Sequence, residues 1–204
     1  MSMTLQRRAL AALALSLGAC ASAPEHLYTL ESAAPAPGGW DQPLVLVGPL
    51  GVPEIVDRPQ LVVRDGKYGV AVSEQERWAT PLKDSLPQVV AMQLGERCPT
   101  ARFGVLSYPA TDEHASHLAV NFTNMDIDRT TGVTVVAAWT FRDDSGHVVA
   151  RVSQGHARME STKFSDYVDG MQRAIAAWAG EVATQIPPCQ TERKSQNPLP
   201  TPEN

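Results

Sequence analysis

The chain has 204 residues, of which 43% are hydrophobic, and its formal net charge is −5 at pH 7. This acidic balance disfavours nucleic acid as a partner, and it disfavours a surface whose main purpose is to bind anionic lipid. The length fits one domain with a substantial hydrophobic core.

The first twenty residues have the organisation of a lipoprotein signal peptide. Two arginines precede eleven uncharged residues, 9–19, which are too few to span a bilayer because a spanning helix needs about 20. The run ends in "LGAC", which resembles the lipobox of bacterial lipoproteins. The resemblance implies that residues 1–19 are removed by cleavage after Ala19 and that Cys20 is lipidated. The alternative is an ordinary signal peptide cleaved after Ala19, with Cys20 as a disulfide partner.

Cleavage would change both the charge and the location of the chain. Removal of residues 1–19 takes away two of the 17 basic residues and none of the 22 acidic ones, which leaves a net charge of −7. Ala21 and Ser22 then follow Cys20, in place of the Asp that retains many Gram-negative lipoproteins in the inner membrane. The resemblance therefore implies anchoring to the periplasmic face of the outer membrane.

Segments rich in small residues and proline flank the predicted domain. Residues 20–43 are rich in Ala, Pro, Gly and Ser and predict a flexible tether after the lipidated cysteine. Only "HLYTL" interrupts it, and Tyr28 and Leu30 fit either a short strand or a segment lying on the domain surface. The domain itself is predicted over residues 44–186. The proline-rich residues 187–204 are expected to be a disordered tail.

The first half of the domain combines short strands with one helix. Residues 43–50 predict a strand, and residues 59–74 predict two extended stretches around Asp65-Gly66, a dipeptide suited to a hairpin turn. Apolar spacing near 3.6 predicts a helix at about 78–97, with Thr80 as N-cap and Pro81 at the first helical position. Because an interior proline removes a backbone hydrogen bond, Pro87 predicts a kink, or a helix that is regular only from about residue 85.

The second half is predicted to be strand-rich until its last helix. A short strand at 101–109 precedes three longer extended segments, 117–128, 132–144 and 146–160. Alternate residues from Val133 to Phe141 are apolar, as in a half-buried antiparallel strand, and a change of parity predicts a bulge near Asn124. Apolar spacing predicts the second helix at 165–186, with Ser165 as N-cap and Pro187-Pro188 as its stop.

These elements predict an α+β fold. We expect a single domain in which a mostly antiparallel or mixed sheet is covered on one face by the two main helices, at about 78–97 and 165–186. Cys98 and Cys189 each follow a predicted helix. In the oxidising periplasm a bridge between them would join the tail to the domain, and two unpaired thiols are the alternative.

Motifs that carry chemistry are missing from the sequence. It has no glycine-rich phosphate loop, no nucleophile elbow and no paired-cysteine metal site. His114 and His117 stand three apart, and His147 and His156 flank a predicted strand, without cysteines or a carboxylate cluster at ligand spacing. The sequence therefore predicts no catalytic residues, no metal and no cofactor.

Two polar segments, "VGPLGVPEIVDRPQLVVR" at 47–64 and "ERWATPLKDSL" at 76–86, carry a family resemblance. The chain resembles the PqiC/YmbA family of auxiliary lipoproteins, which belong to transport systems built around MCE-domain proteins. The resemblance covers about residues 27–186. Pro87 and the Cys98/Cys189 pair depart from the family pattern. The matching motifs are "VGP" at 47–49, "PE" at 53–54, "DRPQLV" at 57–62 with Arg64, and "ERWA" at 76–79 with "PL" at 81–82.

The resemblance implies a non-enzymatic periplasmic α/β domain, anchored by lipid to the outer membrane and able to assemble into a homo-oligomeric ring. Its implied partner is an MCE-domain protein that spans the periplasm and moves lipids between the two membranes. The candidate partner or subunit contacts are Pro53, Glu54, Asp57, Arg58, Pro59, Gln60, Arg64 and Trp78.

Purely structural roles for these residues are the alternative. Asp57 and Arg58 would then form a local ion pair, the prolines would stiffen the chain by fixing φ, and Trp78 would be a core residue. Two other functions also fit the sequence: an envelope lipoprotein that itself binds or hydrolyses a small ligand or glycan, and an auxiliary lipoprotein of another exporter. A deep pocket with convergent polar groups would favour the ligand-binding function.

Overall fold

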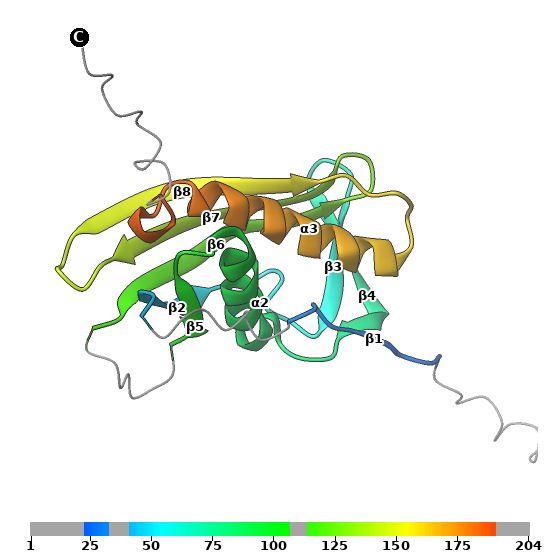
Figure 1. The fold of residues 1–204 in the computed structure, drawn as a ribbon. Coiled ribbons are helices and arrows are strands. Elements are labelled where there is room, and N and C mark those ends of the chain that lie inside the picture. Colours follow the sequence, from blue (N-terminus) through cyan, green and yellow to red (C-terminus); the bar gives the residue numbers. More distant parts are fainter. Residues whose placement is uncertain (1–22, 33–40, 107–113, 191–204) are drawn as a thin grey trace, which may run out of the picture.

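The fold is an α+β domain, as the sequence predicts, in a computed structural model that describes residues 23–32, 41–106 and 114–190 (Figure 1). Eight strands and two long helices make up the described part of the chain. In chain order the elements are β1 (His26–Tyr28), β2 (Leu44–Gly51), β3 (Gln60–Asp65), β4 (Gly69–Trp78), α2 (Leu82–Arg97), β5 (Arg102–Val105), β6 (Ser116–Asp128), β7 (Gly132–Arg142), β8 (Val148–Ala157), α3 (Phe164–Ala183) and the 3₁₀ turn η2 (Pro187–Cys189).

The larger sheet has five strands in the order β5-β2-β6-β7-β8. β2 runs parallel to both β5 and β6, whereas β6, β7 and β8 form an antiparallel meander. The predicted bulge is confirmed, because the β6–β7 register shifts between Phe122 and Asn124. A tight turn joins β7 to β8: the Gly146 N–H donates to the Asp143 carbonyl at 3.1 Å, and Gly146 has a φ of 88°.

The smaller sheet has three strands in the order β1-β4-β3. β3 and β4 form the hairpin predicted around Asp65-Gly66, and β1 adds to β4 in parallel, with His26 opposite Glu76. The strands are therefore divided between two sheets. Local alternation predicts a strand but not its neighbour, so this division was not visible in the sequence.

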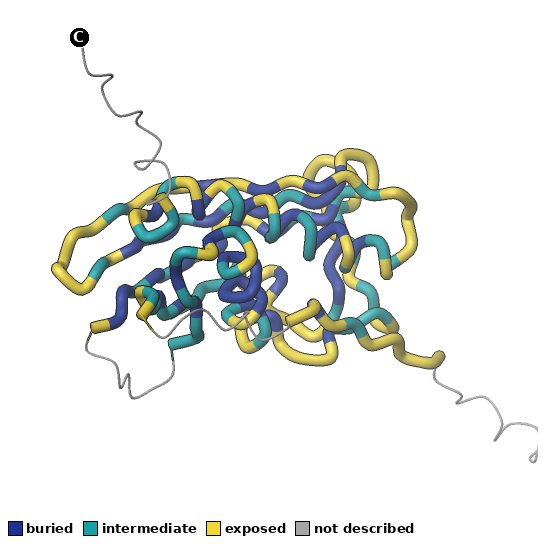
Figure 2. The backbone as a smooth tube through the Cα atoms, viewed as in Figure 1, coloured by how far each residue is buried: buried dark blue, intermediate teal, exposed yellow. Residues whose placement is uncertain are grey.

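Both helices pack on one face of the five-stranded sheet (Figures 1 and 2). The alternate residues Val133 to Phe141 of β7 lie on this face and are at most 1% exposed, which confirms the predicted half-buried strand. α3 approaches β8 at Gly155, where an added Cβ would lie 1.9 Å from the Ala174 carbonyl oxygen. Only a glycine at this position allows the helix and the strand to come so close.

The helix boundaries differ from those predicted. α2 begins at Leu82 and not at residue 78, because Trp78 closes β4 and pairs with Tyr28; its N-cap is Pro81 and not Thr80. The helix runs continuously through Pro87 from residue 82, since its buried apolar side chains compensate for the missing hydrogen bond. α3 begins at Phe164 with Lys163 as N-cap, in place of Ser165, and ends at Ala183.

Segments at both ends of the predicted domain belong to the fold. β1 and Leu30, which is 3% exposed, lie in the range predicted as a tether, so the folded part begins before residue 44. η2 lies in the predicted tail. Its Cys189 forms a disulfide bond with Cys98, and the two Cα atoms are 5.1 Å apart. The bridge joins the end of α2 to the chain after α3. The signal peptide, with Ala19 and Cys20, lies outside the described residues.

Candidate partner-contact surface

The β2–β3 loop, residues 52–59, holds most of the predicted contact residues. The Val56 and Asp57 N–H groups both donate to the Pro53 carbonyl, at 3.0 and 3.1 Å, which closes a turn. Val56 inserts into the core at 8% exposed, whereas its neighbour Ile55 is 55% exposed. Because a buried side chain and two hydrogen bonds fix the turn, it presents Ile55 and the flanking Glu54 from a defined position.

The charged residues of the loop contact α2 and not each other. The Asp57 Oδ2 lies 3.8 Å from the Lys83 Nζ in the first turn of α2. Arg58 is exposed and forms no ion pair with any described residue. The alternative in which Asp57 and Arg58 pair with each other does not hold in this structure. An exposed pair such as Asp57–Lys83 contributes less than about 1 kcal/mol, which leaves Asp57 and Arg58 able to meet a partner.

Three predicted contact residues are not part of this loop. Trp78 is a core residue, since it is only 7% exposed. Its backbone N–H donates to the Pro59 carbonyl at 2.7 Å. Gln60 is half-buried at the start of β3, opposite Arg77. Arg64 lies near the other end of β3, about 13 Å from Gln60 because a strand rises about 3.3 Å per residue. The Arg64 Nε donates to the Asp126 Oδ2 at 2.7 Å and thereby links β3 to β6.

β1 is fastened to β4 by polar side chains that the sequence did not reveal. The Tyr28 hydroxyl donates to the Glu76 Oε2 at 2.6 Å, and the His26 Nδ1 lies 2.9 Å from the Glu76 Oε1. Burial and, after it, the hydrogen bond to Glu76 raise the pKa of Tyr28 to about 12. The hydrogen bonds from Tyr28 and His26 lower the pKa of Glu76. In the sequence only the "ERWA" motif pointed to Glu76. Its hydrogen-bond partners His26 and Tyr28 gave no signal because they lie about 50 positions away.

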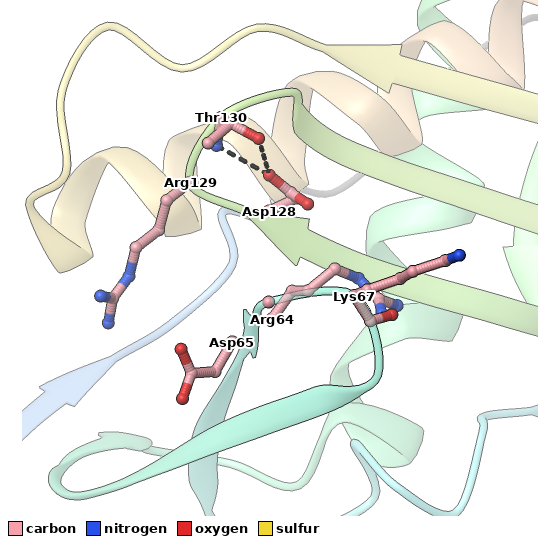
Figure 3. A pocket seen from close by; sticks show the side chains of 7 residues that line it. Arg64, Asp65, Lys67, Asp128, Arg129 and Thr130 are labelled. Carbon is pink, nitrogen blue, oxygen red and sulfur yellow. Dashed lines mark hydrogen bonds between the residues drawn. The ribbon is translucent and has the colours of Figure 1, made fainter.

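A polar hollow of about 580 Å³ lies between the β3–β4 turn and the β6–β7 turn (Figure 3). Asp128 on its wall accepts hydrogen bonds from the Thr130 hydroxyl at 2.6 Å, the Thr130 N–H at 2.7 Å and the Thr131 N–H at 3.1 Å. These bonds lower the pKa of Asp128 to about 2. The carboxylate is therefore ionised at neutral pH and holds the β6–β7 turn together.

Two features of other protein classes are missing among the described residues. No group of three or more His, Cys, Asp or Glu side chains there is placed to hold a metal ion. In residues 23–32, 41–106 and 114–190, no helix has the length and apolar character needed to cross a membrane. What these residues offer instead is a rigid, partly apolar loop surface and several polar hollows.

A comparison with protein families identifies the family of this chain. The family model of the ABC-type transport auxiliary lipoprotein component matches residues 27–183. The chain belongs to this family. The family is of the PqiC/YmbA type, so the resemblance found in the sequence is confirmed. The match begins in β1 and ends with α3, so the matched region includes β1.

Two solved structures share the fold of this auxiliary lipoprotein. The crystal structure of an uncharacterized protein matches with a TM-score of 0.69 at 15% identity, over 81% of this chain and 100% of that one. Protein XCC0632 from Xanthomonas campestris, of family DUF330, matches with a TM-score of 0.60 at 17% identity, over 84% of this chain and 100% of that one. No curated protein sequence matches the chain.

Proposed function

We propose that this auxiliary lipoprotein is a non-enzymatic subunit of an MCE-type intermembrane lipid-transport system, anchored by lipid to the periplasmic face of the outer membrane. There it docks the MCE-domain protein that spans the periplasm. The observation that carries the proposal is the family match over residues 27–183, in a chain whose sequence places a lipobox just before that domain.

The distance between the anchor and the fold supports a position close to the membrane. β1 begins at His26, six residues after the cysteine that would carry the lipid. Six residues span at most about 22 Å when fully extended. The lipid would therefore hold the three-stranded sheet near the bilayer. The linker between them would be much shorter than the tether predicted over residues 20–43.

The β2–β3 loop is the surface that we assign to the partner. Ile55 is an exposed apolar side chain in a loop that also carries the exposed charged residues Glu54, Asp57 and Arg58, and an apolar anchor with a polar rim is the usual composition of an interaction hot spot. The anchored turn adds to this, because a preorganised loop loses little conformational entropy on binding. Self-assembly into a ring would multiply such contacts and raise the affinity through avidity.

Affinity purification of the tagged, lipidated protein from crosslinked envelopes tests the proposal. We expect an MCE-domain protein at near-stoichiometric yield, and a loss of most of it with Ile55→Asp. Val152→Asp is the matched control, because Val152 is 66% exposed on β8, outside the loop. Equal losses with both variants would contradict the assignment of the loop. Absence of an MCE-domain protein from the wild-type sample would favour a free-standing ligand-binding lipoprotein.

The anchor has a separate test, since its failure has a different meaning. Cys20→Ala should release the protein into the soluble periplasm or leave it as unprocessed precursor. A processed Cys20→Ala variant that still fractionates with the outer membrane would show that the lipid is not the anchor, whatever the partner.

A further inference from the structure

β1 is the first strand after the cysteine that would carry the lipid, so its position sets how far the domain stands from the bilayer. β1 begins at His26, six residues after Cys20. Leu30 lies ten residues after Cys20 and is the first buried side chain in the described part of the chain. Residues 26–29 therefore decide between a short and a long linker to the membrane.

Few contacts hold β1 at the edge of the three-stranded sheet. It pairs with β4 over three residues, and no other described strand lies on its outer side. Leu27 is 63% exposed. The Glu25 Oε1 accepts from the Arg77 Nη1 at 2.6 Å, in a pair whose side chains are 54% and 30% exposed. An exposed pair of this kind contributes less than about 1 kcal/mol.

The hydrogen bonds of β1 are also close to solvent. His26 and Tyr28 both contact the Glu76 carboxylate, and the His26 side chain is 59% exposed. The Tyr28 carbonyl accepts from the Ala79 N–H at 2.7 Å. Each such bond contributes about 1 kcal/mol, because water competes for the same groups. A short edge strand held in this way opens locally at a free energy below that of global unfolding.

The chain is anchored in the core directly after β1. Leu30 belongs to the hydrophobic core, and the Glu31 carbonyl accepts from the Gln172 Nε2 of α3 at 3.1 Å. Figure 2 shows the contrast, since the amino end of β1 is exposed and projects from the rest of the domain. Release of β1 would therefore end at Leu30 and would leave both helices and the five-stranded sheet in place.

This release would change the reach of the domain. Six residues span at most about 22 Å, whereas ten residues span at most about 36 Å. As flexible chains the two linkers have mean spans of about 13 Å and about 17 Å. Opening three residue pairs at a sheet edge therefore adds about 14 Å to the greatest distance between the domain and the bilayer.

Given the lipid anchor proposed above, we propose that β1 is a releasable strand that sets the distance between the domain and the membrane. Paired with β4, it holds the domain close to the bilayer. Released as far as Leu30, it lets the domain move outward with its core intact, so that the domain can follow a docked partner without unfolding.

The test compares a locked and a loosened form of the full-length lipidated protein on a supported bilayer of phosphatidylethanolamine with a minority of phosphatidylglycerol. The locked form is Leu27→Cys/Arg77→Cys, since these residues lie directly opposite each other and adjacent strands are close enough for a disulfide. Leu27→Ser/Arg77→Ser is the matched control without a bridge. The loosened form is Glu76→Ala, which removes the acceptor of both His26 and Tyr28.

Neutron reflectometry measures the gap between the bilayer and the protein layer, and hydrogen exchange of the Ala79 amide measures the opening of β1. We expect the gap of Glu76→Ala to exceed that of the locked form by about 4 Å, the difference between the two mean spans. Ala79 should exchange at least tenfold more slowly in the locked form than in the wild type. The serine control should exchange at least as fast as the wild type, which keeps the test valid if Glu76→Ala fails to fold.

Two failures have different meanings. Wild-type protein that washes off the bilayer would contradict the lipid anchor, and the releasable strand with it. Protein that stays on the bilayer with equal gaps in the locked, serine and loosened forms would overturn the releasable strand alone. Exchange of Ala79 at the rate of global unfolding in the wild type would overturn it as well.

Discussion

The two sheets of the domain are held in different ways. The five-stranded sheet buries a whole face under α2 and α3, and its residues Trp139 and Phe141 are at most 1% exposed. The three-stranded sheet leaves Val70 and Val72 of β4 exposed, and its edge strand β1 is held by side-chain hydrogen bonds to Glu76. The difference indicates that the global stability lies in the five-stranded sheet. The smaller sheet can open locally at a lower cost.

The largest expected effect is at Gly155, where α3 lies on β8. Gly155→Val would place a side chain against the backbone of α3, since even a Cβ would meet the Ala174 carbonyl at 1.9 Å. We expect a loss of about 4 kcal/mol or more in the free energy of unfolding, measured in urea. Gly66→Ala is the control: its φ is 68° but nothing lies within 4 Å, so we expect only about 1 to 2 kcal/mol. Equal losses would contradict the division between the sheets.

Next in size is the Cys98–Cys189 bridge, which ties α2 to the chain after α3. It joins residues 91 positions apart, and a bridge that closes so long a loop stabilises by about 4 kcal/mol because it restricts the unfolded chain. The double variant Cys98→Ala/Cys189→Ala should lose this amount in urea. Wild-type protein should also change its mobility on a gel after reduction. An unchanged mobility would mean that the two thiols are unpaired in the cell.

The sequence predicted the elements that have a strong local pattern. Alternation identified β7, and apolar spacing identified both helices, because each pattern reflects one buried face. It left β1 open as one of two alternatives, because this strand is only three residues long and depends on Glu76, a partner about 50 positions away. The start of α2 was misplaced because strand pairing at Trp78 took precedence over the helical spacing.

The candidate surface was predicted in part. The family motif led to the β2–β3 loop, which the structure forms as a turn closed on Pro53. It also included Trp78, which is buried, and Arg64, whose carboxylate partner on β6 has no sequence signal. Ile55 was missed, since an apolar residue beside Val56 gives no sign of which of the two is exposed.

The smallest predicted effect tests how β1 is held. Tyr28→Phe removes the hydrogen bond to Glu76 without changing the ring. We expect the opening of β1 to become easier by about 1 kcal/mol or less, because the pair is partly exposed. The readout is hydrogen exchange of the Ala79 amide, whose N–H donates to the Tyr28 carbonyl at 2.7 Å. Tyr68→Phe is the control, since Tyr68 is 88% exposed.

The pH dependence of that effect follows from the two pKa shifts. The lowered pKa of Glu76 means that its contribution is present above its ordinary pKa of 4.5 and is lost as the pH falls through the lowered value. The raised pKa of Tyr28 means that its contribution is present below pH 10 and is lost between about pH 10 and 12. The difference between wild type and Tyr28→Phe should therefore be full at pH 7 and smaller at pH 3.

A difference that is the same at both pH values would show that packing of the ring, and not the hydrogen bond to the carboxylate, fastens β1. A change in global urea stability as large as the change in Ala79 exchange would show that β1 opens only with the whole domain, and the contrast between the two sheets would then be wrong.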